Sequence, residues 1–172
     1  MPPVDVESAI RTRRTHKAFE PEPIPREQLD ELFELARWAP NHHLTAPWRF
    51  RVIGPRSLDA LKQAAGPEAA AKLDRCPTLV VASCALDGDP LTEEEDLHAT
   101  AVASYIVLLA AHARGLAGYW RTPEVLRTES GRRAVGLPGD ERFVALLHIG
   151  RPKQEQRPPE RPPAAETTIY LD

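Results

Sequence analysis

A long apolar segment in the second half of the chain sets the first constraint on the fold. Residues 92–95 form a capping box, with a threonine at the cap and a glutamate three residues later, and they predict a helix that runs to about Arg114 and ends at Gly115. The middle of this segment is apolar on all sides, so we expect a central, buried helix. Its longest apolar part, residues 99–111, contains polar side chains and is too short to span a membrane.

Shorter segments on either side alternate between helical and strand patterns. The two kinds do not follow a strict βαβ order, so we expect an α+β domain whose central sheet of four or five strands is covered by helices. A length of 172 residues fits a single domain over residues 1–172. The expected strands are 48–53, 78–85, 116–121 and 143–149, and the other expected helices are 5–13, 26–39, 57–65, 67–73 and 123–136.

Charge and cysteine content exclude several classes of protein. With a net charge of −3, the chain has no overall attraction for nucleic acid or anionic membranes, and we expect neither as a partner. Residues 1–5 lack the basic and apolar pattern of a signal peptide, which predicts a cytoplasmic protein. Cys76 and Cys84 cannot build a disulfide framework, so we expect two buried, reduced thiols.

The composition changes at Arg151. Residues 151–163 are rich in proline and cannot form a helix or a central strand, so we expect an extended arm. The arm ends in residues 167–171, which have strand propensity again. A proline arm that ends in an apolar strand suggests docking on a second subunit; the alternative is a disordered tail.

Several catalytic motifs are absent. The sequence has no glycine-rich dinucleotide loop, phosphate-binding loop, zinc-protease motif or hydrolase nucleophile motif. The adjacent His42 and His43 would point in opposite directions on an extended segment, so we expect no metal site. The acidic run 93–96 is better explained as the first turn of a capped helix than as an acid–base pair.

Two polar clusters are candidates for binding. Residues 11–17 hold four cations from Arg and Lys together with two hydroxyls, a combination that suits a phosphate, although cations at a helix end also complement its dipole. Trp120, Arg121 and Thr122 join an aromatic ring, a cation and a hydroxyl where a strand meets a helix. A flat heteroaromatic ligand could lie there, or the tryptophan could be a core residue beside a solvated arginine.

Four segments resemble motifs of the nitroreductase family of flavoproteins, in the same order along the chain. Residues 13–19 resemble its R-R-[ST]-x-[RK]-x-F signature, and residues 39–50 resemble its A-P-x-x-x-x-x-Q-P-W-x-F segment. Residues 115–122 resemble the small-residue segment and W-R-[ST] triplet of its compact bacterial branch. Residues 143–152 resemble its last core strand and I-G-x-P motif.

The resemblance implies an α+β sandwich with a central mixed sheet that forms an obligate homodimer, with the C-terminal arm reaching the partner and one FMN in each of two interface clefts. No residue is assigned a catalytic role, because FMN carries the electron chemistry. The residues that match FMN-binding positions are Arg13, Arg14 and Thr15 for the phosphate and ribityl chain, Lys17 beside the ring, Trp38 and His42 from the partner subunit, Trp120, Arg121 and Thr122 at the ring and phosphate, and Arg161 near the phosphate.

The activity implied is FMN-dependent transfer of hydride from NADH or NADPH to nitroaromatic or quinone-like acceptors by a ping-pong mechanism. The sequence departs from the family pattern at Ala46, which replaces a glutamine, and at Leu44, where larger relatives often have an asparagine. Those departures leave alternatives open: enone reduction, dehalogenation or flavin-related chemistry on the same fold, or a dimeric binding protein without catalysis.

Overall fold

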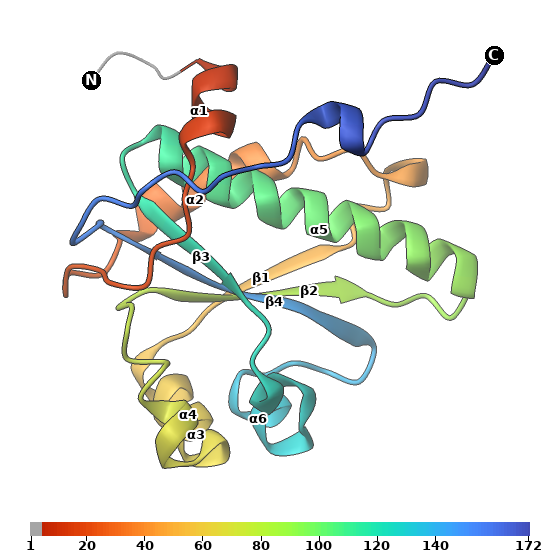
Figure 1. The fold of residues 1–172 in the computed structure, drawn as a ribbon. Helices are drawn as coiled ribbons and strands as arrows, with labels where there is room; N and C mark the ends of the chain where they lie inside the picture. The colour runs from red at the N-terminus through yellow and green to blue at the C-terminus, as the bar shows by residue number, and fades with distance from the viewer. Residues whose placement is uncertain (1–4) are drawn as a thin grey trace.

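The computed structural model describes residues 5–172. Residues 1–4, which belong to the segment expected to lack a signal-peptide pattern, lie outside the described residues. A single sheet separates two layers of helices (Figure 1). The elements in chain order are α1 Val6–Thr12, α2 Arg26–Ala36, η1 His42–Leu44, β1 Trp48–Val52, α3 Pro55–Ala65, α4 Pro67–Ala70, β2 Leu79–Ala85, α5 Pro90–Ala113, β3 Ala117–Arg121, η2 Glu124–Arg127, α6 Glu129–Ala134, β4 Glu141–Gly150 and η3 Ala164–Glu166.

The sheet has four strands in the order β1-β2-β4-β3, and every ladder is antiparallel. The expectation of a mixed sheet is therefore wrong for these strands. The physical reason lies in the connections. Helices α3 and α4 join β1 to its antiparallel neighbour β2, and η2 and α6 join β3 to its antiparallel neighbour β4. Neither connection makes the crossover that a parallel pair requires. Among the described residues, the only parallel pairing outside the strands is an isolated bridge between Thr15 and Gly118.

Alternation along the central strands divides the core in two. On β2, Val80 and Ala82 pack toward α2 and α5, whereas Val81 packs with α3 and α6 on the other face. Figure 1 shows α5 along one face of the sheet and the shorter helices α3, α4 and α6 along the other. This arrangement confirms the predicted α+β architecture, with both central strands buried.

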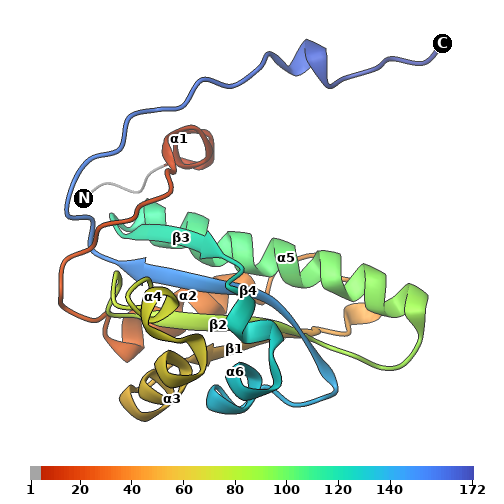
Figure 2. The same cartoon turned by 60° about the horizontal axis from the view of Figure 1, so that its bottom comes forward.

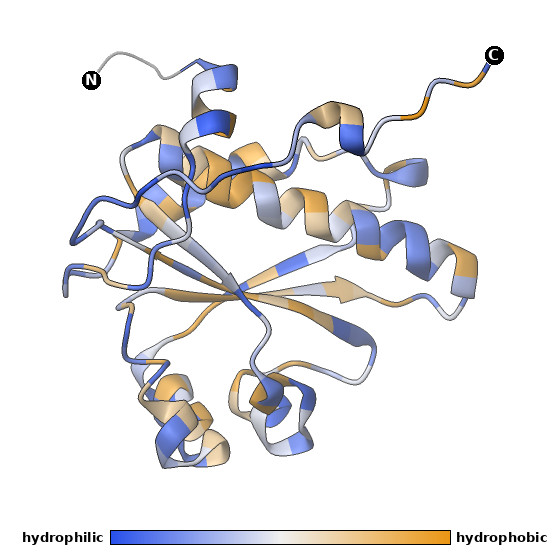
Figure 3. Ribbon diagram, viewed as in Figure 1, coloured by the Kyte–Doolittle hydropathy of each residue, from blue (hydrophilic) through white to orange (hydrophobic). Residues whose placement is uncertain are grey.

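Helix α5 begins earlier than the capping box predicts. Asp89 is the N-cap, its carboxylate accepting from the amide of Thr92 at 2.9 Å, and Pro90 occupies the first turn. Aspartate before proline is a strong start signal and displaces Thr92 from the cap position. By length and hydropathy α5 could cross a membrane, but half of its most apolar window is buried inside the chain. Figure 3 shows its hydrophobic residues in the middle and C-terminal parts, where it packs on the sheet.

Two other expectations change. The helix expected over 123–136 is split, because Thr128 is extended at ψ 154° and caps α6 by accepting from the amide of Gly131. Residues 167–171 form no strand within the chain, and their apolar side chains are exposed. The arm itself is extended as predicted, and Figure 2 shows it running past α1 and away from the sheet. Its tip is hydrophobic (Figure 3).

One histidine is buried in the core on the α3 side of the sheet. His148 on β4 is fully buried, and neither ring nitrogen has a hydrogen-bond partner within residues 5–172. Its ring lies among aromatic side chains, with centroids 5.6 Å from Tyr119 and 6.4 Å from Phe19. Burial, reinforced by the positive charges of Arg121 and Arg75, lowers the pKa of His148 to about 3, so the imidazole is neutral in the folded protein near pH 7.

Candidate functional site

The segment after α1 runs beside β3 and brings two sequence motifs together. Thr15 bridges Gly118, and the backbone amide of His16 donates to the Gly118 carbonyl oxygen at 3.1 Å. Helix α1 ends at Thr12, so the following residues can extend along this sheet edge. The cation-rich motif therefore lies next to the strand that leads to Trp120 and Thr122, as a shared site requires.

The same segment forms a small positively charged cavity with the arm. Its volume is about 210 Å³, and its lining contains four guanidinium groups, a hydroxyl and no carboxylate from the described residues. We call this group of residues the arginine cradle: Arg13, Arg14, Thr15, Arg157 and Arg161. Guanidinium groups and a neutral hydroxyl are the donors that a phosphate prefers. The site geometry thus joins Arg161, which is distant in sequence, to the predicted N-terminal residues.

Two of these arginines are held in place by local contacts. Arg14 donates to the carbonyl oxygens of Arg11 at 2.7 Å and Arg13 at 2.9 Å, and the Arg13 guanidinium lies 5.9 Å from the ring centroid of Tyr105 on α5. Arg157 was not among the residues predicted from the sequence. Its only signal is its place in the proline arm, four residues before Arg161.

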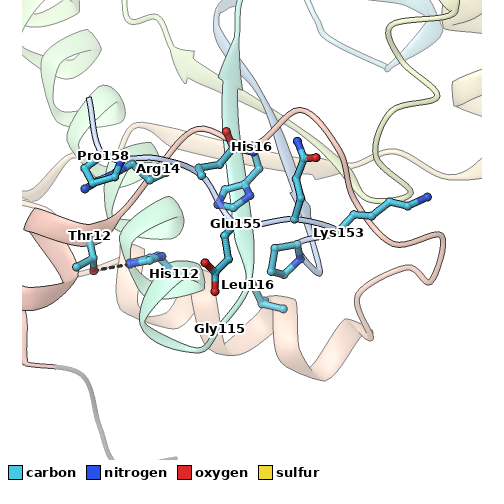
Figure 4. A pocket seen from close by; sticks show the side chains of 12 residues that line it. Thr12, Arg14, His16, His112, Gly115, Leu116, Lys153, Glu155 and Pro158 are labelled. Carbon is cyan, nitrogen blue, oxygen red and sulfur yellow. Dashed lines mark hydrogen bonds between the residues drawn. The ribbon is translucent and has the colours of Figure 1, made fainter. Parts of the chain in front are cut away.

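A larger cavity of about 820 Å³ lies beside the cradle (Figure 4). Thr12 and His112 both line it, and the Thr12 hydroxyl oxygen lies 2.8 Å from Nε2 of His112. Buried His16 lines it as well. Burial is the larger cause that lowers the pKa of both histidines, and the charge of Arg13 lowers it further. The lining combines Lys153 and Glu155, so this cavity is less suited to an anion than the smaller one.

The triplet on β3 divides between different surroundings. Trp120 packs against the core on the α5 side, whereas the Arg121 guanidinium donates to the Lys72 carbonyl oxygen at 3.1 Å. Thr122 is exposed just beyond the strand. None of the three lines the arginine cradle. Lys17 is exposed two residues beyond Thr15.

Of the remaining predicted residues, His42 lies near the N-terminal end of α5, away from Tyr105. Trp38 is 77% exposed after α2, and the Nδ1 atom of His42 lies 2.6 Å from Oε2 of Glu95. Ten residues of helix separate Glu95 from Tyr105, the neighbour of Arg13, which corresponds to about 15 Å along the axis. The arginine cradle contains neither Trp38 nor His42.

Apolar side chains are exposed on α1 and α5. Val6 and Ile10 on α1 are 70% and 52% exposed. Val102 and Tyr105 on α5 are also exposed, and α1 contacts α5 directly. Both cysteines are buried and reduced, as predicted.

Comparisons with known proteins agree with this architecture. A protein from Bacillus subtilis, "Putative NAD(P)H nitroreductase YfhC", is 26% identical over 170 residues, covering 90% of this chain and 88% of its own. A 5,6-dimethylbenzimidazole synthase from Rhodospirillum rubrum is 29% identical and covers 90% of this chain and 85% of its own. The crystal structure of a nitroreductase-like protein from Bacillus cereus matches with a TM-score of 0.88 and 25% identity, covering 98% and 97% of the two chains.

A structure from Desulfovibrio desulfuricans that contains FMN matches with a TM-score of 0.82 and 27% identity, covering 97% of this chain and 96% of that one. The model of the nitroreductase family matches residues 10–151, which include α2, α5, the sheet and the cation-rich segment. This chain belongs to the nitroreductase family.

Proposed function

We propose that the chain is a cytosolic, homodimeric FMN-dependent oxidoreductase that uses NADH or NADPH to reduce nitroaromatic or quinone-like acceptors by a ping-pong mechanism. The observation that carries the proposal is the arginine cradle, in which Arg13, Arg14, Arg157 and Arg161 meet around a cavity without a carboxylate from the described residues. Family membership and the FMN bound to the Desulfovibrio relative support the same ligand.

Each part of FMN has candidate partners among these residues. The guanidinium groups and the Thr15 hydroxyl would hold the phosphate, because they offer charge-assisted and neutral donors around one small cavity. Lys17 follows Thr15 by two residues on an extended segment and would lie on the same side, beside the ring edge that becomes negative on reduction. Trp120 and Thr122 would contact the ring, and Arg121 would join them only by leaving the Lys72 carbonyl.

When bound, FMN supplies the transfer of two electrons and one hydrogen from the nicotinamide to the acceptor. The chain contributes binding, orientation and a positive field around the cradle. One cleft serves donor and acceptor in turn, which is the basis of the proposed ping-pong order.

A homodimer explains the separation of the two groups of site residues. In this proposal Trp38 and His42 of one subunit complete the cleft that holds the arginine cradle of the other. The exposed apolar residues of α1 and α5 support an interface there, since a contiguous apolar surface on a protein of this size marks a contact. The extended arm, with Ile169 and Tyr170 exposed at its tip, would lie against the partner.

The spectrum of the purified protein and its turnover test this function together. We expect a yellow protein with a flavin spectrum that oxidises NADH or NADPH when a nitroaromatic compound or a quinone is added. A colourless protein that does not take up added FMN would contradict the proposal and favour a binding protein without redox chemistry.

A second function deserves the same assay because of one comparison. The dimethylbenzimidazole synthase from Rhodospirillum rubrum covers 90% of this chain at 29% identity, and the nitroreductase-named relative from Bacillus subtilis covers the same share at 26% identity. It favours the alternative of flavin-related chemistry on the same fold. Loss of FMN itself during aerobic turnover, followed by chromatography of the products, would identify that function, whereas intact FMN and a reduced acceptor support the first.

A further inference from the structure

The loop between α2 and β1 has an unusual backbone. Three residues without the freedom of glycine have positive φ angles: His43 at 51°, Leu44 at 56° and Ala46 at 45°. Such a backbone conformation is strained for these residues and persists only where surrounding contacts fix it. The loop therefore holds its neighbours in one arrangement at an energetic cost.

Three anchors fix this loop. The Asn41 side-chain oxygen accepts from the Ala46 amide at 2.9 Å, and the Thr45 hydroxyl donates to buried Asp96 at 2.6 Å. The third anchor is the contact of 2.6 Å between His42 Nδ1 and Glu95 Oε2. Two of the three anchors thus come from consecutive carboxylates on α5.

The His42–Glu95 contact determines which nitrogen of the imidazole exchanges a proton. An ionised carboxylate only accepts hydrogen bonds, so Nδ1 carries the proton in this pair. The other ring nitrogen, Nε2, makes no hydrogen bond within residues 5–172 and is the atom left to exchange a proton with a ligand. The His42 side chain is 59% exposed, so Nε2 is accessible to a ligand.

The charged and titratable groups around this imidazole are few. Glu95 and Asp96 face the loop from α5, and the His43 ring stacks on His42 with centroids 3.9 Å apart. An imidazole whose Nδ1–H is held by a carboxylate presents Nε2 as the atom that exchanges a proton with a ligand, and the protonated ring is then a general acid.

We propose that His42 donates a proton to the acceptor and that Glu95 is its positioning residue. The inference rests on the proposed function, in which His42 enters the partner's cleft. Reduction of a quinone to a hydroquinone needs two electrons and two protons. The nicotinamide supplies both electrons and one hydrogen as hydride, and His42 supplies the second proton. The Nε2–H bond breaks as an O–H bond forms on the quinone, and water then restores the proton to Nε2.

Anaerobic stopped-flow absorbance on the FMN-loaded dimer separates the two half-reactions. NADH should bleach the flavin at the same rate in wild type, His42→Gln and Glu95→Gln, because the first half-reaction needs no proton donor. Return of colour on adding benzoquinone should slow about 100-fold in His42→Gln. Glu95→Gln should slow it less. The matched variants His98→Gln and Glu94→Gln, at exposed positions of α5, should match wild type.

Two readouts distinguish proton transfer from a structural role. Imidazole added to His42→Ala should restore the second half-reaction, in proportion to the imidazolium concentration. In FMN-free protein, ring ¹⁵N shifts should place the proton of neutral His42 on Nδ1, and Glu95→Gln should alter those shifts while Glu94→Gln does not. Three results would overturn this inference and leave the proposed function standing. They are unchanged quinone reduction in His42→Gln with normal bleaching, absence of rescue by imidazole, and a proton on Nε2 of neutral His42. Failure of NADH to bleach the wild type would overturn the proposed function, and this inference with it.

Discussion

The two ends of α5 carry opposite kinds of chemistry. Around Tyr105 and His112 the chain gathers guanidinium groups from α1 and the arm, whereas around Glu95 and Asp96 it gathers carboxylates and a strained loop. One end suits an anion and the other orients an imidazole. In the proposed dimer each end supplies half of a redox site, and an arrangement that places one beside the other would explain why both are built on the same helix.

Deleting residues 154–172 should have the largest effect on this comparison, because it removes Arg157 and Arg161 from the cradle together with the contact proposed for the partner. We expect a monomer that does not retain FMN. Sedimentation velocity and the absorbance of the dialysed protein measure both properties. A truncated chain that stays dimeric and yellow would show that the arm is only a tail.

Arg13→Ala should weaken the cation-rich end alone. Loss of one charge-assisted contact to phosphate costs about 1.5–3 kcal/mol, which corresponds to about 10- to 150-fold in the dissociation constant of FMN. Fluorescence titration of the FMN-free protein measures this constant. Arg56→Ala is a suitable control, since Arg56 is exposed on α3 at a distance from the cradle in sequence. Equal affinity for FMN in the two variants would show that Arg13 does not bind the phosphate.

The cation-rich end could be predicted from the sequence because most of its signal is local. Arg13, Arg14 and Thr15 are adjacent, and the extended segment that carries them follows directly from the end of α1. The central strands could be predicted for a similar reason, since their continuous apolar character needs no partner to be recognised.

The acidic end could not be predicted because it depends on contacts between distant segments. Glu95 reads as part of a capped first turn until the structure places His42 against it, 53 residues away in sequence. Arg157 and His16 were missed similarly, since only the path of the arm brings them to the cavities. Two departures from the predicted helix bounds have local causes. Pro90 after Asp89 moves the start of α5 ahead of the capping box, and the Thr128 hydroxyl caps α6 and so divides the predicted helix.

His148 sets the pH range in which the two ends can be compared on an intact fold. Its folded pKa of about 3 lies below the ordinary value, so the unfolded chain binds the proton first as the pH falls. Its contribution to stability is complete above about pH 6.5 and is lost progressively toward pH 3, by about 2 kcal/mol at pH 5. Urea unfolding of wild type and His148→Leu between pH 7 and pH 5 should show a flatter dependence in the variant. Parallel curves would mean that folding does not lower the pKa of His148.

The smallest effect is also the most specific test of how the two ends meet. His42→Ala and Arg13→Ala subunits, each nearly inactive as homodimers, are mixed under conditions that allow subunit exchange. If each cleft takes Arg13 from one subunit and His42 from the other, one cleft of the mixed dimer carries both substitutions and the other carries neither. Half of the sites in mixed dimers should then recover NADH-dependent quinone reduction, while His98→Ala mixed with Arg13→Ala serves as the reference for a subunit whose His42 is intact. Mass spectrometry of the intact dimers confirms exchange. Absence of recovery after confirmed exchange would mean that Arg13 and His42 of the same subunit share one cleft. The two ends of one α5 helix would then contribute to the same site.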